Sequence, residues 1–185
     1  MCGTACAPGY TMVSGACVLS TCNNQMIDAG EQCDDGNNAT GDGCDANCQL
    51  EAGAVVTGCP SSAGVRITQR GTYVFSGNTT GSPNASGTCN AATAGGGEQG
   101  IAATVNVSLP FTVTVTAQPV TTGYDIILRH GGACSGTCTD DNGANANESY
   151  SIPFTTFAPA GPFYWIIDGK GTTSSGAWRL VITVS

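Results

Sequence analysis

A dense group of carboxylates and amides between Cys22 and Glu51 is the part of the sequence best suited to chemistry. Seven carboxylates occur from Asp28 to Glu51, and no lysine or arginine precedes Arg66. Unpaired carboxylates crowded this closely repel one another, so a folded loop needs either full solvation or a cation. Short oxygen-bearing side chains interleaved with glycines favour a hard ion, and calcium is therefore the cofactor that we expect.

The expected calcium ligands form a central group and a flanking pair. The central group is Asp34, Asp35, Asn37, Asp42 and Asp45, and the flanking pair is Asp28 and Glu31. An EF-hand beginning at Asp34 fails, because Gly36, Ala39 and Asp45 would occupy its third, sixth and twelfth positions. The ion would therefore need another geometry. The alternative is a solvated acidic turn cluster held by disulfides alone.

The cysteines divide the chain into two parts. Eight of the eleven lie in the first third, at Cys2, Cys6, Cys17, Cys22, Cys33, Cys44, Cys48 and Cys59, and the others are Cys89, Cys134 and Cys138. A segment this short with so few large apolar side chains needs crosslinks or metal to fold. The spacings are C-x3-C, unlike the C-x2-C of zinc knuckles. We therefore expect disulfides and a secreted or cell-surface location.

Ten of these cysteines are expected to pair. They are Cys6, Cys17, Cys22, Cys33, Cys44, Cys48, Cys59, Cys89, Cys134 and Cys138. Local bridges Cys6–Cys17 and Cys134–Cys138 fit the chain order and leave Cys59 as a partner for Cys89, but sequence alone does not fix the pairing. Met1 directly before Cys2 does not read as a signal peptide, so we expect a mature or truncated chain. The odd cysteine has three explanations: Cys2 is the lipidated first residue of a bacterial lipoprotein, a partner was lost by truncation, or one thiol stays free and buried.

Beyond Cys59 the sequence becomes rich in Thr, Val and Ile, which is typical of strands. Strict alternation puts Phe111, Val113 and Val115 on one face of a strand and threonines on the other. Further strands are expected at 65–69, 72–76, 101–107, 124–129, 149–157, 163–168 and 178–184. The pattern predicts an all-β fold, an antiparallel, jelly-roll-like β-sandwich over residues 59–185, preceded by a small disulfide-rich, mostly irregular domain over residues 1–58.

The last two strands should each present an inward row. These rows are Phe163, Trp165 and Ile167, and Trp178, Leu180, Ile182 and Val184. A sugar-stacking platform would need aromatic rings exposed on a loop or flat face. Because these rings follow the strand period, we expect them in the core.

Residues 22–51 resemble the cysteine-rich repeat of myxobacterial surface proteins, and the match extends toward Cys59. It rests on Gly-Glu-Gln-Cys-Asp-Asp-Gly-Asn at residues 30–37 and Gly-Asp-Gly-Cys at residues 41–44. The chain departs from the repeat at residues 23–25, where Asn-Asn-Gln replaces the usual glycine-rich opening. The resemblance implies an extracellular structural or adhesive role and no chemistry.

The region 124–184 resembles the pre-peptidase C-terminal domain found beside secreted bacterial proteases. The resemblance rests on Tyr-Asp at 124–125, Asp-Asp-Asn-Gly at 140–143, Glu-Ser at 148–149, Gly-Pro-Phe-Tyr-Trp at 161–165 and Gly-Ala-Trp at 176–178. Some members of that family hold calcium at the edges of the sandwich. The resemblance therefore implies further candidate ligands at Asp125, Asp140, Asp141, Glu148 and Asp168. Alternatively, these acids make turn hydrogen bonds without an ion.

Charge and motifs narrow the function. The net charge is −8, which disfavours nucleic acid as a partner, and no apolar run is long enough to span a membrane. The sole histidine, His130, follows an expected strand and is interpreted as an ordinary surface residue. No G-x-S-x-G, H-E-x-x-H, P-loop or Rossmann motif occurs, so we expect no enzyme.

The expected function is a structural or adhesive module that binds an unidentified surface protein or glycan, with a lipid anchor if Cys2 is lipidated. One alternative is a carbohydrate- or polymer-binding accessory domain of a larger secreted hydrolase. Another is a subunit of an extracellular fibre, joined through the odd cysteine or an exposed strand edge.

Overall fold

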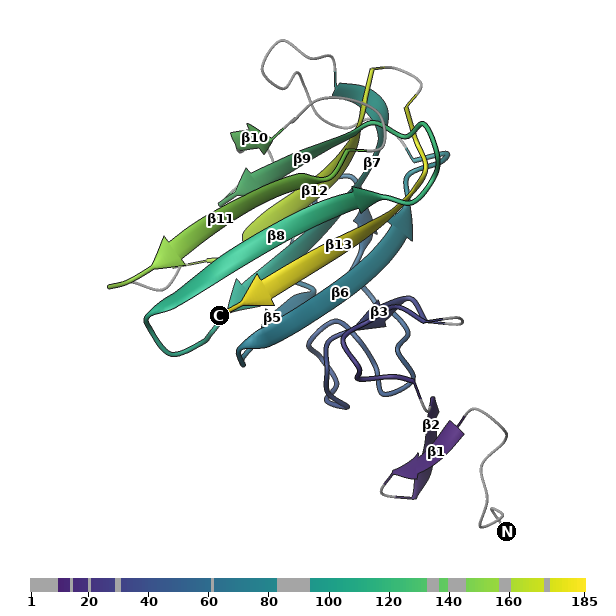
Figure 1. Cartoon of the computed structure of the whole chain (residues 1–185), viewed down its shortest axis with the longest axis vertical. Coiled ribbons are helices and arrows are strands. Elements are labelled where there is room, and N and C mark those ends of the chain that lie inside the picture. The colour runs from purple at the N-terminus through teal and green to yellow at the C-terminus, as the bar shows by residue number, and fades with distance from the viewer. Residues whose placement is uncertain are drawn as a thin grey trace.

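The molecule is built from two β-sheets packed face to face, with a small hairpin at the N-terminal end (Figure 1). A computed structural model describes residues 10–13, 15–19, 21–28, 31–60, 62–82, 94–132, 137–139, 146–156, 161–171 and 174–185. Within these ranges every regular secondary-structure element is a strand. No helix there is long and apolar enough to cross a membrane. The predicted all-β sandwich is confirmed.

Thirteen strands are present in the described residues. They are β1 (Tyr10–Val13), β2 (Ala16–Leu19), β3 (Cys33–Asp34), β4 (Val56–Thr57), β5 (Val65–Ile67), β6 (Gly71–Asn78), β7 (Ala94–Val105), β8 (Phe111–Pro119), β9 (Ile126–Gly131), β10 (Thr137–Thr139), β11 (Glu148–Phe154), β12 (Phe163–Lys170) and β13 (Ala177–Val184). Each of the eight expected strands is found, although β7 begins at Ala94 instead of residue 101.

The strand order defines a jelly roll. One sheet runs β11-β8-β13-β6-β3 and the other β10-β9-β12-β7-β4, with β5 parallel to β7 and the remaining pairs antiparallel. The chain alternates between the sheets from β6 to β9, forms the β9–β10 hairpin, and alternates again from β11 to β13. The set β6, β13, β8 and β11 therefore faces β7, β12, β9 and β10, which is the eight-stranded double Greek key.

Alternation along the strands positions the core. Phe111, Val113 and Val115 are at most 3% exposed, while the threonines between them are only partly buried. Trp165 and Trp178 are buried in the same hydrophobic cluster, as their spacing predicted. Within the predicted inward rows, the one departure is Phe163, which is partly buried at the edge of this cluster.

The cysteine-rich segment extends the sandwich from its edges. Strand β3 pairs with β6, placing Cys33 opposite Phe75, and β4 pairs with β7. Cys33, Cys44 and Cys48 are fully buried in the cluster that also contains Phe75. Part of the interior of the segment is therefore shared with the sandwich, and the sequence boundary at residues 58 and 59 falls between two strands that both pair with β7.

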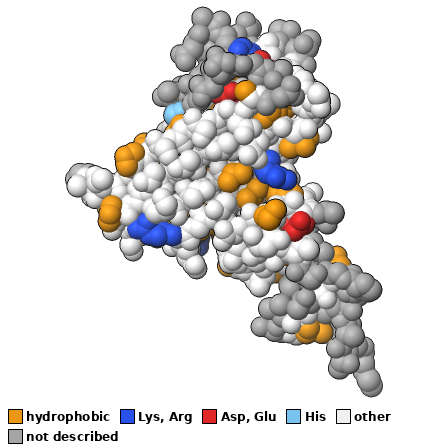
Figure 2. Space-filling model, viewed as in Figure 1, with side chains coloured by type: hydrophobic (Ala, Val, Ile, Leu, Met, Phe, Trp, Pro, Cys, Tyr) orange, Lys and Arg blue, Asp and Glu red, His pale blue; other side chains and the backbone are white. Residues whose placement is uncertain are grey.

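The outward face of the sheet β11-β8-β13 carries hydroxyl groups. Threonines on β8 alternate with its core residues, and the Thr116 hydroxyl lies 3.0 Å from that of Ser149 on β11. Figure 2 shows most of this face as neither charged nor apolar. The face is thus a polar layer with its hydroxyls partly engaged across the strands.

Candidate functional site

Most acids of the cysteine-rich segment accept hydrogen bonds from nearby backbone N–H groups. Asp34 Oδ2 accepts from the N–H of Asn24 at 2.9 Å, and its Oδ1 accepts from that of Gly36 at 2.9 Å. Asp45 Oδ1 accepts from the N–H groups of Asn47 and Gln49, both at 2.9 Å. These acids close turns, as Asp commonly does in irregular segments.

Three more of the predicted ligands, Asn37, Asp28 and Glu31, are also engaged. Asn37 Oδ1 accepts from the N–H of Ala39 at 2.7 Å, and Asp28 Oδ2 accepts from the Asn24 side-chain amide at 2.8 Å. Both carboxylate oxygens of Glu31 are engaged, one by the Thr21 hydroxyl and one by the Asp28 N–H, each at 2.8 Å. These groups hold the shape of the segment.

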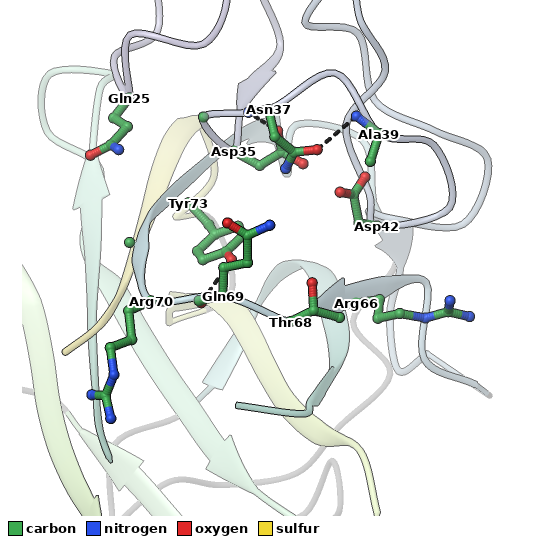
Figure 3. A pocket seen from close by; sticks show the side chains of 12 residues that line it. Gln25, Asp35, Asn37, Ala39, Asp42, Arg66, Thr68, Gln69, Arg70 and Tyr73 are labelled. Atoms are coloured by element: carbon green, nitrogen blue, oxygen red, sulfur yellow. Dashed lines mark hydrogen bonds between the residues drawn. The ribbon is translucent and has the colours of Figure 1, made fainter. Parts of the chain in front are cut away.

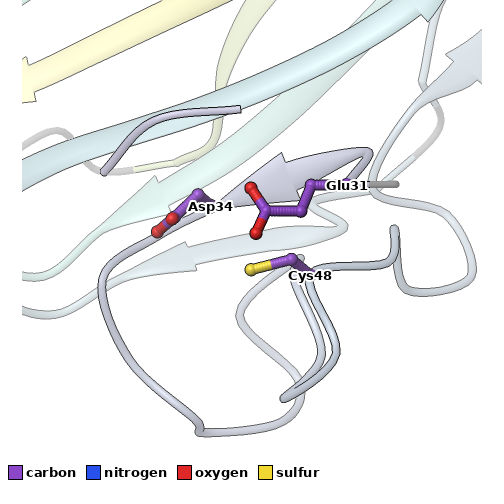
Figure 4. A group of neighbouring side chains, drawn as sticks. All are labelled: Glu31, Asp34 and Cys48. Atoms are coloured by element: carbon purple, nitrogen blue, oxygen red, sulfur yellow. The ribbon is translucent and has the colours of Figure 1, made fainter. Parts of the chain in front are cut away.

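Glu31, Asp34 and Cys48 form one compact group of potential metal ligands, and Figure 4 shows the three side chains next to one another. Their ligand atoms all lie within 4.8 Å of one another. However, the Cys48 sulfur is bonded to Cys22, and a disulfide sulfur is not the thiolate that binds metals. The group therefore offers a metal ion no thiolate, and both of its carboxylates already accept hydrogen bonds.

Asp35 and Asp42 differ from the other acids of the cysteine-rich segment. Asp35 Oδ2 and Asp42 Oδ1 are buried and have no hydrogen-bond partner among the described residues. Asp35 is only 6% exposed, although its Oδ1 accepts from the Asn37 N–H at 3.2 Å. Burial, and after it the charge of Asp42, raise the pKa of Asp35 to about 7. The two carboxylates therefore favour an added positive charge between them.

The two carboxylates line a pocket of about 180 Å³. Its other wall is the β5–β6 connection, from which Thr68 and Gln69 contribute. Figure 3 shows the Thr68 hydroxyl and the Gln69 amide directed into the space below Asp35 and Asp42. Behind them, the Tyr73 hydroxyl donates to the backbone carbonyl of Gln69 at 2.9 Å. The pocket is an oxygen-rich space between the cysteine-rich segment and the sandwich.

Two arginines also line this pocket but turn their guanidinium groups away from it. The Arg70 Nη2 donates to the carbonyls of Ser108 at 3.2 Å and Pro110 at 2.5 Å. Figure 3 shows the guanidinium groups of Arg66 and Arg70 on opposite outer sides of the pocket. Within the described part of the chain, no ion pair involves Asp35 or Asp42.

Acids of the sandwich are distributed over different places. Asp168 lies on the outward side of β12, where it accepts from Arg129 at 2.5 Å. Glu148 is fully buried at the start of β11, opposite the core residue Ala117. Asp125 precedes β9 and lies 4.0 Å from the Lys170 ammonium. Strand alternation thus directs Asp168 to the outward side of its sheet and Glu148 to the interior of the sandwich, and the two do not form one site.

His130 corrects an expectation. The sequence placed it after a strand as an ordinary surface residue, whereas it lies within β9 and is partly buried. Its ring stacks on Tyr150 with centroids 3.6 Å apart, and burial lowers its pKa. The Tyr150 hydroxyl also accepts a hydrogen bond from Trp165. His130 is thus part of the aromatic packing between β9 and β11.

Two disulfides are described in full, Cys22–Cys48 and Cys33–Cys44. Cys17 and Cys59 are also disulfide-bonded. Several predicted residues lie outside the described residues, as does the side chain of Cys138. They are Cys2, Cys6, Cys89, Cys134, Asp140 and Asp141.

Two parts of these arrangements were missed by the sequence analysis. Thr68 and Gln69 gave no signal, because polar residues between two strands are ordinary turn formers. The ion-pair partners of Asp168 did give a signal in the sequence. Arg129 follows Ile126, Ile127 and Leu128 in a buried strand, and a buried arginine needs a carboxylate. Besides Asp168, Arg129 has a second carboxylate partner, Glu98, at 3.7 Å.

The fold and the pocket together define a class, a disulfide-bonded jelly roll with an acidic, cysteine-rich segment paired to its edges. Residues 3–49 match a family model described as "Domain of unknown function (DUF4215)". The match overlaps the predicted repeat from residue 22 to residue 49 and begins earlier, at residue 3. Its description names no organism or activity.

Curated proteins and solved structures give no further family assignment. A search of curated proteins found no match. Among solved structures, the chain is similar to the pre-Peptidase C-terminal Domain of Collagenase from Bacillus anthracis. That likeness has 12% identity, covers 65% of this chain and 92% of that chain, and gives a TM-score of 0.36. At this TM-score the likeness carries no argument, and the sandwich rests on the strand pairings described above.

Proposed function

We propose that the chain is a secreted or surface-displayed, non-catalytic module with a structural or adhesive role, stabilised by disulfides and calcium. Four cysteines form buried or partly buried bridges, Cys22–Cys48 and Cys33–Cys44. Disulfides of this kind persist in oxidising compartments, which supports export. The shared interior of segment and sandwich supports a rigid element.

The observation that carries the calcium proposal is the pair of buried, unpartnered oxygens Asp35 Oδ2 and Asp42 Oδ1. A buried carboxylate with no compensating charge is costly, and two adjacent ones are more so. A hard cation with several oxygen ligands removes this cost. The acids that the sequence grouped with them have turn-closing partners instead, so we assign the ion to Asp35 and Asp42.

Calorimetric titration of the full chain with CaCl2, after treatment with EDTA, tests this proposal. We expect saturable binding and a higher Tm, because a ligand at about one hundred times its Kd stabilises the folded state by about 2.7 kcal/mol. Asp35→Asn should abolish both effects. Asp45→Asn is the matched control, since it removes one charge from the same segment while its Oδ1 can still accept from Asn47 and Gln49. A Tm unaffected by EDTA would overturn the metal proposal.

The adhesive role needs a separate measurement. The protein is immobilised on beads and presented to a glycan array and to cells of the producing organism, with CaCl2 or EDTA. Retention on cells without glycan selectivity supports an adhesive or structural role. Selective binding to one polysaccharide would instead favour an accessory domain of a hydrolase. Exposed aromatic side chains that could stack on sugars are limited to Tyr10 in the described residues.

A further inference from the structure

The pocket between Asp35 and Asp42 is formed by two segments distant in the sequence. One wall is the acidic loop, residues 35–42, which lies between the bridged Cys33 and Cys44. The opposite wall is the β5–β6 connection, with Thr68 and Gln69. A backbone hydrogen bond from Arg66 N–H to the Asp42 carbonyl, 3.0 Å long, fixes one end of the loop on the sandwich.

On this basis, and resting on the proposed calcium site, we infer that the ion is shared between the acidic loop and the sandwich, so that calcium ties the loop to the β5–β6 connection. Its ligands are Asp35 Oδ2 and Asp42 Oδ1 from the loop, and the Thr68 hydroxyl and the Gln69 side-chain carbonyl from the sandwich. Waters complete the shell, because calcium takes about six to eight oxygens.

Three features of the pocket support a shared ion. Asp35 is more than nine-tenths buried, and its unpartnered oxygen lines the pocket. Thr68 and Gln69 are exposed side chains that turn toward the same space in Figure 3. The arginines that could neutralise the pair from the sandwich are turned outward, with Arg70 bonded to two carbonyls elsewhere. The oxygen atoms thus converge from both walls.

An ion shared in this way would restrain the motion of the acidic loop. The loop is anchored at its ends by the Cys33–Cys44 disulfide and the Arg66–Asp42 hydrogen bond. Between them, most of residues 36–41 is exposed. A metal held by Asp35 and the β5–β6 connection would restrain this stretch, and its removal would release the loop without unfolding the sandwich.

Terbium provides a direct probe, because it replaces calcium and is sensitised by a nearby tyrosine. Tyr73 lines the pocket, so we expect terbium luminescence on excitation of tyrosine, and displacement of that signal by CaCl2. Asp35→Asn should abolish the signal. Tyr73→Phe should remove the luminescence but keep calcium binding by calorimetry. Luminescence that survives in Tyr73→Phe would place the ion elsewhere and overturn the inference.

The decisive variant is Thr68→Val/Gln69→Ala, which removes both oxygens of the sandwich wall. Both side chains are exposed, so near-ultraviolet circular dichroism should be unchanged. We expect the Kd for calcium to rise on the order of tenfold or more, by analogy with the loss of supporting groups at metal sites. Asp45→Asn should leave it within about twofold, since that carboxylate is not a ligand.

Hydrogen exchange of residues 36–41 gives an independent measurement. Calcium should slow exchange in the natural sequence and fail to do so in Thr68→Val/Gln69→Ala at the same occupancy. If calcium binds in an Asp35-dependent way while the double variant changes neither affinity nor exchange, the ion is not shared with the β5–β6 connection. The proposal of a calcium-stabilised module is then unaffected. If calcium does not bind at all, both the calcium part of the proposed function and the shared ion are wrong.

Discussion

Arg129 and Asp168 form a buried ion pair on the outward side of the sheet β9-β12, with Arg129 Nη2 2.5 Å from Asp168 Oδ2. Both side chains are at most 4% exposed. Glu98 on β7 lies 3.7 Å from the same guanidinium, so two carboxylates share one positive charge. Burial, and after it the charge of Glu98, raise the pKa of Asp168 to about 7 against the opposing effect of Arg129.

The raised pKa makes stability depend on pH in a defined direction. The folded state favours protonated Asp168, whereas the carboxyl has its ordinary pKa of 3.8 when the chain is unfolded. Its contribution is therefore fully present below pH 3.8 and is lost as the pH rises toward about 7. We expect Asp168→Asn to gain stability relative to the natural sequence across this interval. Melting at several pH values, with excess CaCl2 throughout, measures the difference. A constant Tm difference from pH 4 to pH 7 would contradict the shift.

Removing the shared cation should cost far more than removing one acid. In Arg129→Met, Glu98 and Asp168 remain buried without their cation, and breaking a buried pair in this way typically costs about 3–5 kcal/mol. Urea denaturation at neutral pH measures the loss. The triple variant Arg129→Met/Glu98→Gln/Asp168→Asn is the control, because it removes the charges together. It should recover much of the loss, and equal instability of both variants would show that the arginine acts through packing instead.

The sequence predicted the strands whose side chains alternate cleanly. Phe111, Val113 and Val115 were assigned to the core from their period of two, and they are buried. The same reasoning could not find β3 and β4, because a two-residue strand has no period. Their positions depend on pairing with β6 and β7. That pairing explains how a segment with few apolar residues is accommodated.

The candidate site was predicted by composition and not by geometry. A run of acids indicates a cation but does not say which carboxylates lack other partners. Asp34 and Asp45 look equivalent to Asp35 and Asp42 in the sequence, yet backbone N–H groups engage the first two. Thr68 and Gln69 reach the pocket only through the fold, since they lie 26 residues or more from Asp42 in the chain.

The Cys33–Cys44 disulfide should stabilise the whole domain because it lies in the shared core. Both cysteines are fully buried in one cluster with Val65 and Phe75. Removing a native disulfide from a small domain costs about 2–5 kcal/mol, so Cys33→Ala/Cys44→Ala should lower the Tm of the sandwich itself. Near-ultraviolet circular dichroism of the buried Trp165 and Trp178 reports the sandwich. If their signal melts unchanged while the cysteine-rich segment unfolds earlier, the two parts do not fold as one unit.

Gly43 marks the closest approach of the acidic segment to the sandwich. Its φ is +118°, and a Cβ added there would lie 2.8 Å from Val65 Cγ2 and 3.3 Å from Phe75 Cε1. Gly43→Ala therefore adds a steric clash in the core to the strain of a left-handed backbone, and overpacking alone typically costs about 1–3 kcal/mol.

Gly41→Ala is the matched control, because Gly41 has a φ of +84° but no atom within 4 Å of the added Cβ. Chemical denaturation of both variants separates the two effects. We expect Gly43→Ala to lose at least about 1 kcal/mol more than Gly41→Ala. Equal losses would mean that the contact with Val65 and Phe75 yields easily, and that the acidic segment is held on the sandwich by the β3–β6 pairing and the disulfide alone.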